Sequence, residues 1–593
     1  MTATTAEKPA RPVEIAERAL AAIARRGEDG VWISVVPAEA LMNDARDLER
    51  RHARGEPLPL YGQSFAVKDN IDVAGLPTTA ACLALATTPA RHATVVARLI
   101  QAGALCVGKT NLDQLATGLT GVRSPYGVPR NLFDERYVVG GSSSGSAVAV
   151  AAGLVDFALG TDTAGSGRVP AAFNNLVGLK PSRGIFSTAG VVPACPSLDC
   201  VSIFSLTVEE AQRVAEIARG ADDADPFSRP EADGFAFTGG LRPPRFRFGI
   251  PAAAALDFRG DDAAAAAFAH ALDRIRALGG EPIEIDFTPF REAGALVYEG
   301  AYVAERLIAG GDLLARDPEA LLPPVRTILT GARDVGARAA FETQRKVAQL
   351  RRATRRLLAP VDFLLVPTTP TIPRIADVQA DPLRLNAALG AFTTFVNPLD
   401  LAALAVPGGF RDDGLPAGVS LVGPWGSDAR LAAFGSAIHR ATSDRLGALG
   451  RSLPPESPPA AAVPDGWLGI AVVGAHLSGE PLNHQLTELG GRFVRAARTT
   501  PAYRLYALPN TTPPKPGLVR ASEGGGSVDL EVWALSAAAF GTFVGKIPAP
   551  LAIGRIALTD GTTVSGFLCE SYAAEGATDI TATGGWRRYL GRA

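Results

Sequence analysis

Two serines and one lysine, each embedded in small residues, could carry out acyl-transfer chemistry without a histidine. Ser142 lies in the glycine- and serine-rich segment 140–146, and Ser166 lies in a second such segment, 160–168. Lys68 ends a short apolar run upstream of both. Serine is a weak nucleophile unless a neighbouring group accepts its proton, and a lysine can accept it when burial keeps the amine neutral. These residues therefore predict an amide-cleaving site.

Histidine chemistry fits this chain less well. There are six histidines, and those at positions 92, 270 and 439 fall in helical patterns, which favours structural roles. The Gly-x-Ser-x-Gly turn that precedes an Asp and a His in many serine hydrolases does not stand out. We therefore expect lysine, and not histidine, to activate the serine.

Residues 103–110 (GALCVGKT) match the nucleotide-binding P-loop pattern letter for letter. A P-loop needs a strand before its first glycine and a helix after its Lys-Thr. Here the preceding residues 94–101 have a helical pattern, and residues 104–107 have the composition of a strand. Because this order would bury the loop inside a sheet, we predict that the segment does not bind ATP.

The composition indicates a globular protein and excludes several classes of partner. Of 593 residues, 47% are hydrophobic and 20% are charged. Lys+Arg number 58 and Asp+Glu number 60, so no basic surface for nucleic acid is expected. Five cysteines without paired spacing favour reduced thiols in the cytoplasm. We expect no signal peptide, no membrane span, no metal and no cofactor.

Periodicity predicts an α/β fold. Residues 1–60 have helical patterns, and from residue 61 short apolar runs alternate with helical stretches, as in a sheet covered by helices. Residues 205–360 have mainly helical patterns. The clearest single elements are predicted helices at 263–278 and 339–358 and predicted strands at 362–367 and 418–423.

A second domain is predicted after a linker. Residues 1–450 form the first domain, and residues 451–466 are rich in proline and alanine without apolar periodicity. Residues 467–593 contain several short apolar runs separated by glycine and proline, which predicts a small β-rich domain. Its expected strands are 468–473, 528–535, 551–558 and 563–568.

The two serine segments resemble the signature of the amidase signature family. Residues 140–146 (GGSSSGS) and residues 160–170 (GTDTAGSGRVP) match its hallmark segments, and the two serines are 24 positions apart (166 − 142). Lys68 stands in the family's Val-Lys-Asp context, and residues 108–111 resemble another family segment. The resemblance covers about residues 10–440 and implies a mixed central sheet covered by helices.

The resemblance also implies roles for individual residues. Ser166 would be the nucleophile, and Ser142, preceded by a cis peptide, would relay its proton to Lys68. Gly141 would relieve steric crowding at that peptide. Backbone N–H groups would form an oxyanion hole, where small side chains let a substrate approach the backbone. These N–H groups belong to Thr163, Ala164, Gly165 and Ser166.

Two further expectations concern the neighbours of these residues. Asp162 and Arg168 are expected to form an ion pair that braces the turn around the nucleophile. Ser143, Ser144 and Ser146 are expected to cap a helix at 147–153, since serine favours helix N-termini.

Within the family, three features resemble allophanate hydrolases. Gly167 replaces the larger residue common after the nucleophile, the extra C-terminal domain is present, and its segment 473–483 resembles the allophanate hydrolase C-terminal domain, which is related to γ-glutamyl cyclotransferase-like folds. Residues 116–125 also resemble these enzymes. The implied substrate is allophanate, a planar acyl urea that bears a carboxylate.

Recognition of that carboxylate calls for a cation, best a guanidinium. Tyr298 and Arg306 are eight residues apart on a predicted helix, about two turns along one face. By resemblance they would hold the carboxylate, and Gly118 would contact the other end of the substrate. On the residues alone, Arg306 could instead be an ordinary surface arginine of a helix.

The implied pathway is hydrolysis of allophanate to ammonia and N-carboxycarbamate, followed by decarboxylation. His476 is the acid–base candidate of the C-terminal domain, or else a hydrogen-bonded core histidine, and Asn483 and Arg520 are weaker candidates. The resemblance implies urea carboxylase as functional partner and a homodimer. Two alternatives stay open: a broad-specificity amidase, and a non-catalytic subunit of a tRNA-amidating complex.

Overall fold

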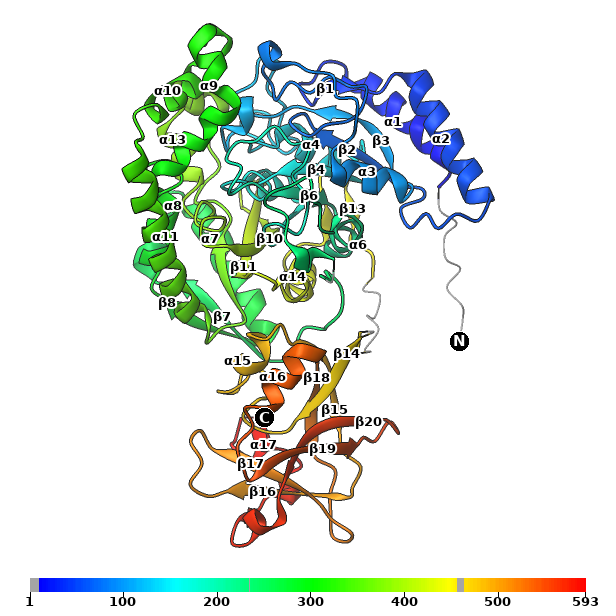
Figure 1. Ribbon diagram of the computed structural model, residues 1–593, viewed down its shortest axis with the longest axis vertical. Coiled ribbons are helices and arrows are strands. Elements are labelled where there is room, and N and C mark those ends of the chain that lie inside the picture. The colour runs from blue at the N-terminus through cyan, green and yellow to red at the C-terminus, as the bar shows by residue number, and fades with distance from the viewer. Residues whose placement is uncertain (1–9, 234, 456–462, 465, 593) are drawn as a thin grey trace.

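The larger body of the protein is built on one mixed β-sheet (Figure 1). A computed structural model describes residues 10–233, 235–455, 463–464 and 466–592. In these residues the sheet has eleven strands in the order β1-β3-β2-β4-β6-β5-β10-β11-β9-β7-β8. The strands are β1 (Trp32–Val35), β2 (Ser64–Lys68), β3 (Leu105–Thr110), β4 (Phe157–Thr161), β5 (Val177–Lys180), β6 (Val201–Ser205), β7 (Phe246–Pro251), β8 (Gly280–Ile285), β9 (Phe363–Pro367), β10 (Leu401–Phe410) and β11 (Pro416–Pro424).

Both faces of this sheet are covered by helices, which explains why a central strand such as β9 is apolar without interruption. In β9, Phe363 and Leu365 belong to one core cluster, whereas Leu364 and Val366 belong to another. Side chains of a strand alternate between the two faces, so a strand buried on both sides needs apolar residues at every position. The predicted α/β fold with a mixed sheet is confirmed.

The helices of this body surround the sheet (Figure 1). They are α1 (Pro12–Arg26), α2 (Ala38–Ala53), α3 (Thr94–Gln101), α4 (Ser144–Ala151), α5 (Val169–Phe173), α6 (Val208–Ala218), α7 (Asp262–Ala277), α8 (Thr288–Ala295), α9 (Leu307–Arg316), α10 (Pro323–Ala332), α11 (Ala337–Leu358), α12 (Ile375–Ala380), α13 (Arg384–Leu389) and α14 (Asp428–Thr442). The helices predicted at 263–278 and 339–358 correspond to α7 and α11. In the described residues, no helix is long and apolar enough to cross a membrane.

The expectation that residues 205–360 are mainly helical is wrong for two strands. β7 and β8 pair in parallel at one edge of the sheet. β8 is the outermost strand, is only partly buried and contains Pro282, which is tolerated on an edge strand. Such a strand lacks the apolar signal of a central one, so its sequence does not reveal it.

The C-terminal domain has its own hydrophobic core and is rich in β-structure, as predicted (Figure 1). A five-stranded sheet in the order β15-β18-β14-β20-β19 packs beside a three-stranded sheet in the order β17-β16-β21. Its elements in the described residues are β14 (Trp467–Val472), α15 (His484–Thr487), β15 (Arg492–Arg498), β16 (Tyr503–Leu508), β17 (Lys515–Arg520), β18 (Asp529–Ser536), α16 (Ala537–Val544), β19 (Leu551–Ala557), β20 (Thr563–Cys569), β21 (Thr578–Asp579) and α17 (Trp586–Tyr589).

The predicted linker 451–466 is only partly described by the structure. Its first two residues form β13 (Arg451–Ser452), which pairs with β12 (Arg445–Leu446). Residues 456–462 and 465 lie outside the described part of the chain. The predicted division into 1–450 and 467–593 therefore stays a prediction.

Candidate active site

Lys68 ends β2 in the interior of the larger body, next to Ser142. Its Nζ lies 2.7 Å from Ser142 Oγ and 2.7 Å from Thr161 Oγ1, at the end of the parallel strand β4. Lys68 and Ser142 are both fully buried. Burial lowers the pKa of Lys68 to about 7, against the opposing influence of Asp113, Asp199 and Asp162. Near neutral pH this amine can therefore accept a proton from Ser142.

The P-loop look-alike is part of the sheet. Helix α3 precedes it and residues 105–110 are strand β3, so the order predicted from sequence is confirmed. Lys109, the lysine of the pattern, is fully buried, and its Nζ lies 3.0 Å from Asp69 Oδ1. The segment therefore supports the strand that carries Lys68.

The peptide bond between Gly141 and Ser142 is cis, as the family resemblance implies. A side chain at Gly141 would collide with the carboxylate of Asp113 and the backbone nitrogen of Gly121. The Asp113 amide donates to the Ser142 carbonyl at 3.0 Å. Glycine at 141 and the hydrogen bond from Asp113 thus fix the backbone on which Ser142 is presented.

The serines that follow Ser142 do not cap a helix, and this expectation is wrong. Helix α4 begins at Ser144, and none of its N-terminal N–H groups bonds to the side chain of Ser143. The Ser143 hydroxyl donates to the Thr161 carbonyl (3.2 Å), and Ser146 donates to the Leu159 carbonyl (2.9 Å). Ser144 donates weakly to the Asn111 carbonyl (3.4 Å). Because all three are buried, their hydroxyls bond to backbone carbonyl groups of β4 and of the segment after β3.

The loop before the predicted nucleophile is braced by a buried ion pair. Two nitrogens of Arg168 lie 2.8 and 2.9 Å from the carboxylate of Asp162, and both side chains are fully buried. This pairing was expected. The same carboxylate accepts the amide of Gly165 at 2.8 Å and that of Gly167 at 3.1 Å. The Asp162 carboxylate thereby fixes the backbone conformation of the turn from Gly165 to Arg168.

Of the N–H groups expected to form the oxyanion hole, one is already hydrogen-bonded and three are available. The amide of Gly165 is engaged by Asp162. Within the described residues, the amides of Thr163, Ala164 and Ser166 have no protein acceptor. Ser166 is 3% exposed, and its hydroxyl donates to the Gly118 carbonyl at 3.4 Å. The available oxyanion donors are therefore those on either side of Gly165.

Tyr298 and Arg306 come together, although not on one helix. Tyr298 lies in a turn after α8, and Arg306 ends a short 3-10 helix, η5 (Ala301–Arg306). Gly300 between them has extended backbone angles (φ −99°, ψ −171°), which interrupt the helix expected from sequence. The Arg306 guanidinium nonetheless lies 5.2 Å from the centre of the Tyr298 ring.

Arg306 is buried, which excludes the surface role left open by the sequence. It is 3% exposed, and its Nη1 donates to Thr117 Oγ1 at 2.8 Å. Thr117 adjoins Gly118, whose carbonyl accepts the hydroxyl of Ser166. The structure therefore brings a buried cation close to the loop that contacts the predicted nucleophile.

Comparison with known proteins now assigns the fold. The amidase family profile matches residues 14–432, and the allophanate hydrolase C-terminal domain profile matches residues 468–591. The chain belongs to the amidase family. The resemblance seen in the sequence is confirmed in both parts of the chain.

Similar proteins include one that contains both parts of this amidase. The solved structure of Kluyveromyces lactis allophanate hydrolase is 39% identical and superimposes with a TM-score of 0.77, covering 99% of this chain and 97% of that one. Urea amidolyase from Saccharomyces cerevisiae is 43% identical over 588 residues, which are 95% of this chain and 31% of that protein. This amidase thus spans about a third of the urea amidolyase that it matches.

A third relative resembles the larger body only. A glutamyl-tRNA(Gln) amidotransferase subunit from Prosthecochloris aestuarii is 34% identical over 445 residues, covering 69% of this chain and 91% of that protein. Because matches to this kind of protein leave the C-terminal domain unaccounted for, the alternative of a tRNA-amidating complex is not favoured.

His476 in the C-terminal domain is enclosed by aromatic rings. Its ring stacks on Phe567 at 5.0 Å and meets the edge of Phe543 at 5.2 Å, while Nε2 lies 3.0 Å from Gln485 Oε1. Burial lowers the pKa of His476 to about 4, so the ring is neutral at neutral pH. Asn483 donates to the His476 carbonyl at 2.9 Å.

Arg520 bonds to other residues and not to His476. It donates to the Tyr503 hydroxyl at 3.0 Å and to the Arg555 carbonyl at 2.7 Å. These contacts join β17 to β16 and to β19 of the other sheet, so they account for Arg520 without a ligand.

Several buried polar residues near the site were missed by sequence reasoning. Asp113 presents its carboxylate to the amides of Gly121 (3.0 Å) and Arg123 (2.9 Å). Asp199 accepts the Thr163 hydroxyl at 2.5 Å, and burial raises its pKa to about 6. The signal in the sequence was weak, since each is a single acid in a loop and bonds to groups that no sequence motif links to it.

Proposed function

We propose that this amidase hydrolyses allophanate, releasing ammonia and N-carboxycarbamate, in the degradation of urea. The observation that carries the proposal is the buried Arg306, held against Tyr298 and bonded to Thr117, next to the loop that contacts Ser166. A buried guanidinium beside a serine nucleophile suits an amide substrate that bears a carboxylate. The similarity to an allophanate hydrolase over both domains supports the same substrate.

In the first half of the reaction, Ser166 Oγ attacks the carbonyl carbon of the terminal amide. Ser142 accepts the proton from Ser166 and passes its own to the neutral amine of Lys68, 2.7 Å away. Negative charge develops on the carbonyl oxygen, where the amides of Thr163, Ala164 and Ser166 can donate hydrogen bonds. Each such donor contributes roughly 3 kcal/mol to stabilising the transition state.

The proton then returns to the leaving nitrogen, and ammonia departs. The acyl group remains on Ser166 as an ester, while Lys68 is neutral again. Water attacks this ester and gives its proton through Ser142 to Lys68, which returns it to Ser166 as the ester breaks. The products of this domain are ammonia and N-carboxycarbamate, and the serine is regenerated.

We propose that the C-terminal domain assists the later decarboxylation. The contacts of His476 support a structural role, because a ring whose pKa is lowered to about 4 cannot act as an imidazolium acid at neutral pH. As a neutral base it remains the acid–base candidate of this domain. Replacing it by asparagine and following carbon dioxide release separately from ammonia release distinguishes the two roles.

The wider setting is also a proposal. The functional partner is urea carboxylase, which would supply allophanate, and the length of urea amidolyase beyond the part matched here supports a linked activity. Five buried cysteines without disulfides, Cys82, Cys106, Cys195, Cys200 and Cys569, support a reducing compartment such as the cytoplasm. A homodimer is proposed from the family resemblance.

Ammonia release from allophanate by the purified chain tests the proposal, with acetamide and benzamide as alternative substrates. We expect turnover of allophanate that falls at least a thousandfold in Ser166→Ala. Ser571→Ala, an exposed serine of the C-terminal domain, is the matched control and should retain full activity. Turnover of the simple amides without allophanate would instead establish the broad-specificity amidase.

A further inference from the structure

Two buried guanidinium groups hold the same residue, Thr117. Arg123 Nη1 donates to the Thr117 carbonyl at 2.9 Å, and Arg306 Nη1 donates to the Thr117 hydroxyl at 2.8 Å. Each arginine is 3% exposed. The sequence singled out only Arg306, and it assigned no individual role to Arg123 within the segment 116–125.

Within the part of the chain that the structure describes, neither cation has a carboxylate to pair with. The side chain of Arg123 bonds to the carbonyl groups of Thr117 and Pro382, and that of Arg306 bonds to the Thr117 hydroxyl. Among the described residues, the Nε atom of each is buried without a hydrogen-bond partner. The carboxylate of Asp113 receives the backbone amide of Arg123 instead of its guanidinium.

Such an arrangement is costly for a folded protein. A buried charge is normally paired, because removing it from water is not offset by hydrogen bonds to neutral groups alone. Two like charges gathered on one residue add repulsion. An anion that enters between them would relieve both costs, so the pair is suited to a carboxylate.

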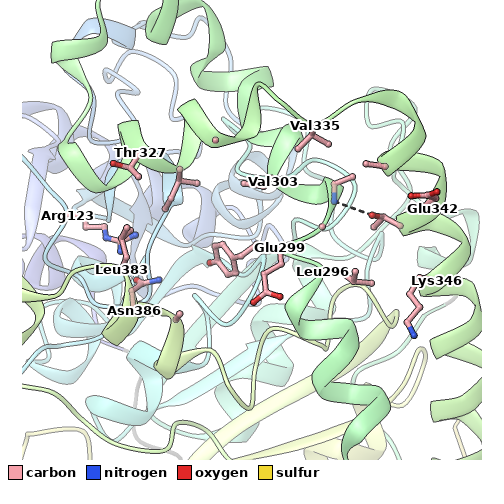
Figure 2. A pocket seen from close by; sticks show the side chains of 18 residues that line it. Arg123, Leu296, Glu299, Val303, Thr327, Val335, Glu342, Lys346, Leu383 and Asn386 are labelled. Atoms are coloured by element: carbon pink, nitrogen blue, oxygen red, sulfur yellow. Dashed lines mark hydrogen bonds between the residues drawn. The ribbon is translucent and has the colours of Figure 1, made fainter.

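A cavity in the larger body reaches one of these two cations. It has a volume of about 690 Å³ and is lined by Arg123, Tyr298 and Asn386, among others, whereas Arg306 is not in its wall. Figure 2 shows Arg123 and Asn386 together on one side of the cavity, opposite Glu342 and Lys346. Arg306 lies behind the ring of Tyr298. A solute in the cavity therefore meets Arg123 before it meets Arg306.

We propose that Arg123 is a specificity-determining residue, which together with Arg306 selects substrates that carry a carboxylate over neutral substrates of the same shape. The cavity in front of Tyr298 is the space from which such substrates arrive. This inference rests on the proposed function insofar as the carboxylate is that of allophanate.

If Arg123 only supported the loop, its replacement would affect charged and neutral ligands alike. The hydrogen bonds from Arg123 to Thr117 and Pro382 hold the loop that precedes Gly118, and that support does not depend on the charge of a ligand. Recognition of a carboxylate does depend on it. Comparison of a charged ligand with its neutral isostere therefore separates the two roles.

The test measures binding by calorimetry in a Ser166→Ala background, where allophanate is not turned over. Biuret, in which a carboxamide replaces the carboxylate, is the neutral isostere. We expect the further change Arg123→Gln to raise the Kd of allophanate about tenfold, or about 1.4 kcal/mol, and that of biuret less than twofold. Arg123→Lys should restore part of the loss. Arg352→Gln, an exposed arginine of α11, is the matched control.

Two outcomes would overturn the inference. An equal loss for allophanate and biuret would make Arg123 a brace for the loop, and unchanged binding of both would give it no part in recognition. If the wild-type chain neither hydrolyses allophanate nor binds it as Ser166→Ala, the proposed function fails instead. Malonate and malonamide, titrated against the same variants, would then decide the role of Arg123 independently of the substrate.

Discussion

The pH dependence of ammonia release should report the state of Lys68. Its pKa is lowered by burial from 10.5 to about 7, and only the neutral amine can accept the proton of Ser142. For a pKa near 7, roughly a tenth of the lysine is neutral at pH 6 and roughly nine-tenths at pH 8. We therefore expect kcat/KM for allophanate to rise about tenfold over that interval and then to level off.

The lowered pKa of Lys68 also makes the free energy of unfolding depend on pH. The lowering of the pKa of Lys68 from 10.5 to about 7 corresponds to a free energy on the order of 5 kcal/mol. Because the unfolded lysine keeps its proton up to about pH 10.5 and the folded one loses it near 7, folding releases a proton within this window. The contribution of Lys68 to the unfolding free energy thus grows as pH rises from about 7 to 10.5, and Lys68→Met should lack this dependence.

The assay is initial ammonia release at fixed ionic strength from pH 5.5 to 9.5, with Ser166→Ala as blank. Lys68→Arg is the first comparison, since a guanidinium stays protonated throughout and should reduce kcat/KM at least a thousandfold. Asp199→Asn is the second, because Asp199 has a pKa raised by burial to about 6 and also raises that of Lys68. We expect kcat/KM of this variant still to rise with pH, but with the rise displaced to lower pH.

Three results would refute this reasoning. A rise in kcat/KM that continues to pH 9.5 would mean that Lys68 has an ordinary pKa. Substantial activity in Lys68→Arg would remove lysine as the base. If kcat/KM of Asp199→Asn no longer rose with pH, the rise in the wild type would report the Asp199 carboxyl group and not Lys68.

Three further predictions concern the surroundings of the reacting groups. Gly141→Ala should abolish ammonia release and lower Tm, since its side chain would collide with the Asp113 carboxylate, and thermal unfolding followed by circular dichroism measures the second effect. Asp162→Asn leaves the guanidinium of Arg168 buried without its charge partner, which should cost about 3–5 kcal/mol in denaturant unfolding. Arg306→Lys should raise KM for allophanate about tenfold with little change in kcat, because lysine lacks the planar fork that binds both carboxylate oxygens, and steady-state kinetics separate the two constants.

The fold could be predicted from sequence for helices with one apolar face and for strands that are apolar throughout. Helix α11 and strand β9 carry clear apolar periodicity, and both were located within two residues. The strands β7 and β8 could not be located, because the choice of strand over helix depends on pairing with residues far along the chain. Tyr298 and Arg306 show the same limit, since they meet across a turn and not along a helix.

The site residues could be found by motif, but their hydrogen bonds could not. The serines after Ser142 illustrate why, since serine next to a helix favours capping only when the helix N-terminus is open to it. Here α4 packs against strands β2, β3 and β4 of the sheet, and the hydroxyls of Ser143 and Ser146 bond to carbonyls of β4. Packing of one element against another thus decides what a polar side chain does.

The chemistry of Lys68 depends on a strand geometry that a reader of the sequence would overlook. Lys68 and Asp69 are adjacent, which suggests an ion pair, yet neighbouring residues of an extended chain point to opposite faces. Asp69 meets Lys109 of the neighbouring strand β3, 3.0 Å away, and in the described residues no carboxylate forms an ion pair with Lys68. Lys68 is left beside two hydroxyl groups, and burial lowers its pKa to about 7. Lys109→Met would leave the negative charge of Asp69 uncompensated next to Lys68, and we expect it to raise the pKa of Lys68, measured as a shift of the kcat/KM profile to higher pH.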